Sequence, residues 1–175
     1  MSRRHLAGFE FIPRRRRSLS DPEELQRRIV RCLESAFRAA DRERWVASRP
    51  YRTERVKEAL ADLGREQGLR VCASGCHADE GEWLYDMSWF TYDRGEAGFF
   101  TSQPMVLESE WSPDPEIDGD LQKLVQARAD VRVWVFAAGN ADDFKAYVDR
   151  CRRRADLFGQ SGDRYVCAAF DSSLA

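Results

Sequence analysis

The segment VRVWVFAA, residues 131–138, constrains the fold more than any other part of the sequence. It is an almost unbroken run of β-branched and aromatic residues, which is typical of a strand buried on both faces of a sheet. Such a strand is usually parallel to a neighbour and is reached through a helical crossover. Residues 118–129 have the apolar spacing of that helix, with Leu121, Leu124 and Val125 on one face. The chain is therefore predicted to be an α/β protein.

Further helices and strands are predicted on both sides of this unit. The residues SDPEE at 20–24 supply helix-capping chemistry, and apolar side chains then recur every four residues, which predicts a helix that runs to about Val46. A second helix is predicted to follow Pro50 and to end near Gly68. Strand composition marks 69–75, 82–92 and 99–111, an amphipathic helix follows at 144–155, and 164–171 is a last strand. Polar connectors with glycine predict that the first three strands pair antiparallel, so the order is ααβββαβαβ.

The length of 175 residues suits one hydrophobic core, and 43% hydrophobic residues are enough to fill it. We predict one domain over residues 21–175, with a helical extension at 21–50 and the core at 51–171. Residues 1–20 carry six arginines and one glutamate, so they are predicted to form a basic, flexible arm. No apolar run approaches the roughly 20 residues that cross a bilayer, and five scattered cysteines indicate free thiols, so a cytoplasmic protein is expected.

Three carboxylates are predicted to meet on neighbouring strands. Alternation along MVLESEW places Glu108 and Glu110 on one face. Asp86 is predicted to lie within the preceding strand, on the face opposite a core-directed stripe made of Trp83, Tyr85, Met87 and Trp89. An antiparallel hairpin would bring Asp86 beside the two glutamates, where like charges are unfavourable without a cation. Hard oxygen ligands suit Mg²⁺ or Mn²⁺, so the three residues are candidate ligands of a metal that promotes phosphodiester hydrolysis.

Residues 51–171 resemble the PD-(D/E)XK nuclease superfamily, which has the restriction-endonuclease-like fold. The resemblance rests on Asp86 in the second of three strands and on Glu108-Ser109-Glu110 in the third. It implies an αβββαβ core with a mixed sheet and Mg²⁺-dependent cleavage of nucleic acid. Glu110 occupies the position of the family lysine, and Lys123, on the next predicted helix, is the candidate replacement. The resemblance also makes a glutamate of the helix before the first strand, Glu54 or Glu58, a further candidate ligand.

Three functions remain open from the sequence. The first is a nuclease that acts on DNA or RNA, with Asp86, Glu108, Glu110 and Lys123 as catalytic residues. The second is a catalytically inactive nuclease-fold module that binds protein or nucleic acid, which the missing lysine favours. The third is a zinc-stabilised interaction protein that uses Cys72, Cys76 and His77, with Cys167 as a further ligand. No membrane partner is predicted, a homodimer is left open, and DNA or RNA would contact the arm through Arg3, Arg4, Arg14, Arg15, Arg16 and Arg17.

Overall fold

A mixed five-stranded sheet forms the centre of the protein. The computed structural model describes residues 21–93, 99–112 and 116–171. The strands lie in the order β1-β2-β3-β4-β5, where β1 to β3 pair antiparallel and β4 and β5 continue the sheet in parallel. This confirms the α/β class, the antiparallel pairing of the first three strands and the parallel crossover. The strands are β1 (Arg70–Ala73), β2 (Met87–Tyr92), β3 (Phe100–Glu110), β4 (Val131–Ala138) and β5 (Arg164–Asp171).

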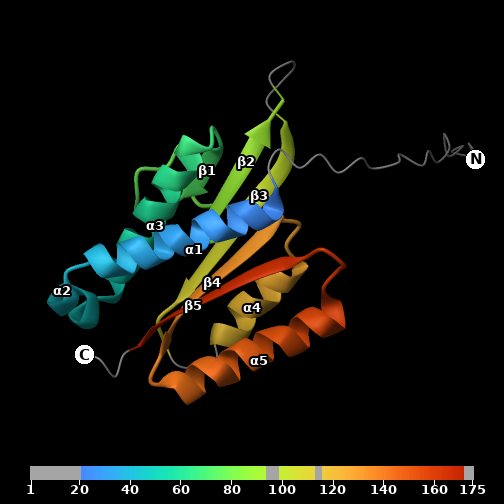
Figure 1. Ribbon diagram of the computed structural model, residues 1–175. Helices are drawn as coiled ribbons and strands as arrows, with labels where there is room; N and C mark the ends of the chain where they lie inside the picture. The colour runs from blue at the N-terminus through green and yellow to red at the C-terminus, as the bar shows by residue number, and fades with distance from the viewer. Residues whose placement is uncertain (1–20, 94–98, 113–115, 172–175) are drawn as a thin grey trace, which may run out of the picture.

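Helices cover both faces of the sheet (Figure 1), and each face has its own apolar core. Met105 and Leu107 of β3 belong to the core beneath α1 and α3, whereas Val106 belongs to the core beneath α4 and α5. This alternation sends every second side chain of β3 to the α4 side. The helices are α1 (Pro22–Ala39), α2 (Arg42–Ala47), α3 (Arg49–Glu66), α4 (Glu116–Gln126) and α5 (Ala141–Phe158).

The single helix that we predicted from residue 21 to about Val46 is wrong, because two helices occupy this segment. α1 ends at Ala39, and Ala40 has an extended backbone. Asp41 then caps α2, since its side chain accepts a hydrogen bond from the Arg44 amide at 2.8 Å. The break turns Trp45 into the core, where its ring lies edge-on to Phe37 with centroids 5.3 Å apart.

The second strand is shorter than predicted, because β2 begins only at Met87. The preceding chain pairs instead with the outer edge of β1, where the Ala73 amide donates to the Glu80 carbonyl at 3.0 Å. Strand alternation therefore does not extend back to Trp83. Its side chain is 60% exposed rather than directed to the core, and it packs beside Phe100 with ring centroids 5.6 Å apart. Asp86 consequently lies just before β2 and not within it.

α3 packs against the sheet at Gly64 more closely than a side chain would allow. A Cβ atom there would lie 2.7 Å from Nε1 of Trp89 and 2.9 Å from Cγ2 of Val71. Overpacking of this kind costs about 1–3 kcal/mol, which exceeds the gain of about 1 kcal/mol in helix propensity. Gly64→Ala is expected to lower the free energy of unfolding in urea. Gly119→Ala on α4, where the same atom meets open space, is the control and is expected to raise it. Equal stability of Gly64→Ala and wild type would contradict the close contact.

Candidate active site

Asp86 and Glu108 come together across the start of β2 and the end of β3. Met87 pairs with Leu107, so one further step of the antiparallel register places Asp86 opposite Glu108. Oδ2 of Asp86 accepts hydrogen bonds from the Ser109 amide at 2.8 Å and from the Ser109 hydroxyl at 2.6 Å. The Asp86 carboxylate thus takes the place of a main-chain acceptor where the strand begins, which fixes its orientation.

Glu108 is a buried carboxyl group that lacks a hydrogen bond at one oxygen. Its exposed fraction is 2%, and among the described residues its Oε1 has no hydrogen-bond partner of good geometry. Burial, with smaller contributions from the negative charges of Asp120 and Asp86, raises the pKa of Glu108 to about 8. A cation beside Glu108 would offset all three effects.

Lys123 provides one such positive charge. The side chain reaches from α4 to Glu108, with Nζ 3.2 Å from Oε1, and it also donates to Oδ1 of Asp120 at 2.9 Å. Desolvation opposes the charged form, but the hydrogen bond to Asp120 and the charge of Glu108 together raise the pKa of Lys123. About half of this side chain is exposed to solvent. The ammonium group therefore stays charged beside Glu108 and can also reach a ligand in solution.

Glu110 and the two glutamates of α3 do not join this group. Oε1 of Glu110 accepts a hydrogen bond from the Ser112 amide at 2.5 Å and so closes the turn after β3. Glu58 pairs with Arg55 on its own helix at 2.8 Å, and Glu54 is exposed. Of the four predicted residues, Asp86, Glu108 and Lys123 are brought together, whereas the Glu110 carboxylate has another partner.

Two charged residues of the site, Lys57 and Glu82, were not predicted from the sequence. Nζ of Lys57, on α3, lies 3.1 Å from Oε2 of Glu82 and 3.7 Å from Oδ1 of Asp86, and only 4% of the Lys57 side chain is exposed. Burial opposes ionisation of Glu82, but hydrogen bonds from Ser74 and Lys57 lower its pKa.

The sequence contains a signal for Lys57. Lys57 precedes Leu60, Ala61 and Gly64 by three, four and seven residues, which is the spacing of one helix face. All three of these residues are buried. A lysine on the buried face of a helix indicates a carboxylate partner inside the fold.

Asp86 and Glu108 are the carboxylates of this site that could ligate a hydrated magnesium or manganese ion. Mg²⁺ commonly binds one or two protein carboxylates and keeps several water molecules, and Asp86 and Glu108 supply such a pair. Within residues 21–93, 99–112 and 116–171, no group of three histidine, cysteine or acidic residues is arranged to hold a metal. Cys72, Cys76 and His77, which we considered as zinc ligands, therefore form no such group either. All five cysteines are free thiols, as predicted.

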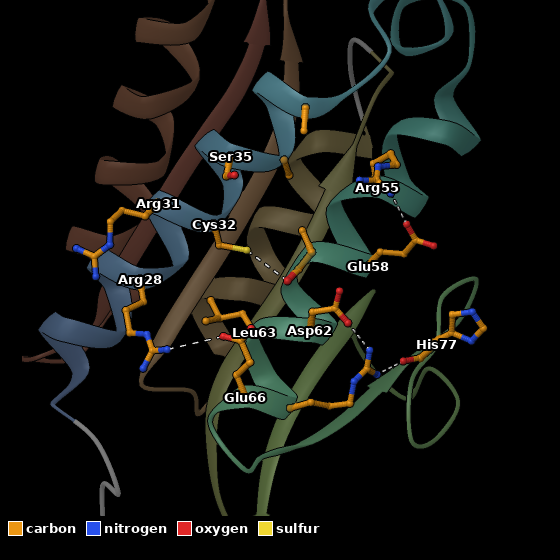
Figure 2. A pocket seen from close by; sticks show the side chains of 14 residues that line it. Arg28, Arg31, Cys32, Ser35, Arg55, Glu58, Asp62, Leu63, Glu66 and His77 are labelled. Carbon is orange, nitrogen blue, oxygen red and sulfur yellow. Dashed lines mark hydrogen bonds and ion pairs between the residues drawn. The ribbon is translucent and has the colours of Figure 1, made fainter.

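A cavity of about 640 Å³ lies elsewhere, between α1 and α3 (Figure 2). Its walls carry charged side chains that already have partners, and the Cys32 thiol donates to the Ala59 carbonyl at 3.3 Å. Burial raises the pKa of this thiol to about 11, so it is a poor nucleophile. The Cys32 thiol therefore gives this cavity no reactive nucleophile. The paired arginines of its wall are Arg28 (to Gln67), Arg31 (to Glu24), Arg55 (to Glu58) and Arg65 (to Asp62 and the His77 carbonyl).

Comparisons of the chain with family models, with curated proteins and with solved structures gave no match. The geometry of the site is therefore the basis for inferring function. The predicted arm, with its arginines at positions 3, 4 and 14–17, lies outside the described residues. In the part of the chain that is described, none of the helices combines the length and the apolar character required to cross a bilayer.

Proposed function

We propose that the protein is a divalent-metal-dependent nuclease of the restriction-endonuclease-like type, which hydrolyses phosphodiester bonds of nucleic acid. The observation that carries this proposal is that Asp86 and Glu108 lie opposite each other where β2 begins and β3 ends, with Lys123 of α4 beside Glu108. The strand order supports it, because three antiparallel strands are followed by a helix and a parallel strand, as in the αβββαβ core.

Asp86 and Glu108 would hold the metal, which when bound supplies Lewis acidity and a more acidic water molecule. The other residues have roles that follow from their contacts. Ser109 and Lys57 orient the carboxylate of Asp86. Lys123 presents its ammonium group to the negative charge of a phosphate, and Asp120 holds it in place. We give Glu110 no role at the metal, because its Oε1 accepts a hydrogen bond from the Ser112 amide in the turn after β3.

Metal binding is tested by thermal unfolding with Mn²⁺ or Ca²⁺. A ligand that binds only the native state stabilises it by about 2.7 kcal/mol at 100 times its Kd, so the Tm of wild type is expected to rise. The rise is expected to disappear in an Asp86→Asn, Glu108→Gln double variant and to persist in Glu110→Gln. An unchanged Tm in wild type, or an equal rise in the double variant, would refute the metal site. Cleavage assays with Mn²⁺ on single-stranded DNA, duplex DNA and RNA test the activity.

A nuclease-fold module that binds without cleaving is the second candidate. It is favoured by the position of Lys123, whose ammonium group already lies 3.2 Å from Oε1 of Glu108 where a cation would bind, and by the carboxylate pair, which is one ligand short of a three-residue site. Under this alternative, nucleic acid binds equally well with EDTA and with Mn²⁺, and no substrate is cleaved.

A further inference from the structure

The first turn of α3 carries positive charge where helices normally carry acidic residues. Arg49 and Arg52 lie there, and this turn contains no acidic residue. The N-terminal end of a helix is the positive end of its dipole, so cations at this end are unfavourable and a bound anion is favourable. An anion would turn this unfavourable arrangement into a favourable one.

Arg52 is a buried arginine whose side chain has no hydrogen-bond acceptor among the residues that the structure describes. Its exposed fraction is 8%, its guanidinium lies over the Trp111 ring at 5.0 Å, and its Nε is buried without a hydrogen bond. In the part of the chain that the structure describes, its side chain forms no ion pair. Burial and the charge of Arg49 lower the pKa of Arg52. The other buried arginine, Arg132, donates instead to three carbonyl groups and pairs with Asp163. A buried guanidinium normally has such partners, so Arg52 lacks an acceptor that a ligand can supply.

The end of β3 completes this environment. Nη1 of Arg49 donates to the Ser112 hydroxyl at 2.7 Å, and Nε1 of Trp111 donates to the Thr53 hydroxyl at 2.8 Å. These contacts place Ser112 beside Arg49 and hold the neighbouring Trp111, against which Arg52 lies, close to the first turn of α3.

The main chain of α3 has few donors left for a ligand. The Tyr51 amide is used by the Ser48 side chain, the Arg52 amide by the Ser48 carbonyl, and Pro50 has none. The arginine side chains are therefore the donors that a ligand would meet.

We propose that Arg49, Arg52 and Ser112 form a phosphate-binding site at the N-terminus of α3. The planar guanidinium group matches the oxygen atoms of a phosphate. Two guanidinium groups beside a helix N-terminus therefore favour an oxyanion over a neutral ligand. The phosphate group belongs either to a nucleic-acid backbone or to a free ion, and assigning it to nucleic acid rests on the proposed function.

The position of the site suits a nucleic acid that also reaches the acidic residues. Ser112 follows Glu108 by four residues, which is at most about 13 Å of extended chain. Arg52 and Lys57 lie on one helix, about 7–8 Å apart along its axis. A backbone whose scissile phosphate lies beside Asp86 and Glu108 can therefore place a phosphate from a nearby nucleotide on Arg49 and Arg52.

Inorganic phosphate is the first probe, with the full-length protein and EDTA present. At constant ionic strength, replacing chloride with phosphate is expected to raise the Tm of wild type. The rise is expected to be lost in Arg52→Gln and in Arg49→Gln and to be kept in Arg55→Gln, a control on the same helix whose arginine pairs with Glu58. Arg49 is exposed, so its replacement tests the site without disturbing the core. An equal rise in wild type and both site variants, or no rise in wild type, would overturn the phosphate site.

A labelled oligothymidylate, followed by fluorescence anisotropy in EDTA, is the second probe. Each site variant is expected to bind more weakly and to lower the dependence of log K on log salt by about 0.7, the value for one phosphate contact on a single strand. A phosphate effect on Tm without this change in slope would assign the site to free phosphate and reject the nucleic acid. Neither probe needs a metal, so a negative result with phosphate and oligothymidylate would not refute metal binding by Asp86 and Glu108. A negative Mn²⁺ result would likewise not refute the phosphate site.

Discussion

Glu108→Gln is expected to make the protein markedly more stable than wild type in alkaline buffer without added metal. The pKa of Glu108 is raised to about 8 from its ordinary value of 4.5, so the folded state holds the proton more tightly than the unfolded state does. The stability that this proton provides is complete below about pH 4.5 and is lost as the pH rises through about 8. Between about pH 5 and pH 8 the loss is on the order of 3 kcal/mol. Glutamine resembles the protonated acid and does not ionise, so the variant escapes this loss.

The measurement is the free energy of unfolding in urea at several pH values for both proteins. The difference between variant and wild type is expected to grow through the neutral range. Glu110→Gln is the control and is expected to follow wild type, because that carboxylate is only half-buried and bonds to a main-chain amide. A difference that stays constant with pH would mean that the Lys123 ion pair already keeps Glu108 charged.

Arg132→Met is expected to cause the largest loss of stability of any substitution considered. The Arg132 guanidinium donates to the carbonyl groups of Leu124 at 3.0 Å, Ala127 at 2.6 Å and Ala129 at 3.1 Å, and it lies 3.0 Å from Oδ1 of Asp163, whose side chain is 9% exposed. Methionine would leave that carboxylate without its counter-charge and would remove the donors that Arg132 supplies to the three carbonyl groups. Removing one partner of a buried pair costs about 3–5 kcal/mol, and urea unfolding measures it.

A double variant separates the lost ion pair from lost packing. Arg132→Met with Asp163→Leu is expected to recover part of the stability, because no buried charge remains unpaired. Arg27→Gln breaks an exposed pair with Glu23 and Glu24 and is expected to cost no more than about 1 kcal/mol. If Arg132→Met were as mild as Arg27→Gln, the buried network would contribute little.

The sheet could be predicted from the sequence largely because its strands have distinctive compositions. The β-branched and aromatic run of β4 matches the observed strand, Val131–Ala138, and β5 matches the predicted 164–171. Polar connectors with glycine predicted the antiparallel order of β1 to β3, although the connection from β1 to β2, residues 74–86, is longer than the hairpin loop that we predicted. The start of β2 was missed, because aromatic residues such as Trp83 suit a strand by composition while the pairing of Glu80 with β1 is a long-range choice. The break before α2 depends on one capping residue, Asp41, within a helical pattern.

The proximity of Asp86 and Glu108 was also predictable from local sequence, since strand alternation and hairpin register together place Asp86 near Glu108. Lys57 and Glu82 were not found, because they come from a helix and a loop whose approach to Asp86 depends on tertiary packing. The same holds for Arg52, which reaches Trp111 across 59 positions of sequence. The local periodicity of the sequence does not indicate contacts between residues so far apart in the chain.

The close packing of Gly64 has a consequence for residues that it never touches. Lys57 and Arg52 are carried by the same rigid helix, so the separation between their two charges is set by its rise per residue. A methyl group at position 64 would lift this helix from Trp89 and displace both charges in concert. Under the proposed function, Gly64 would therefore set where these two charges lie relative to the acidic residues of the sheet, although glycine has no chemistry of its own.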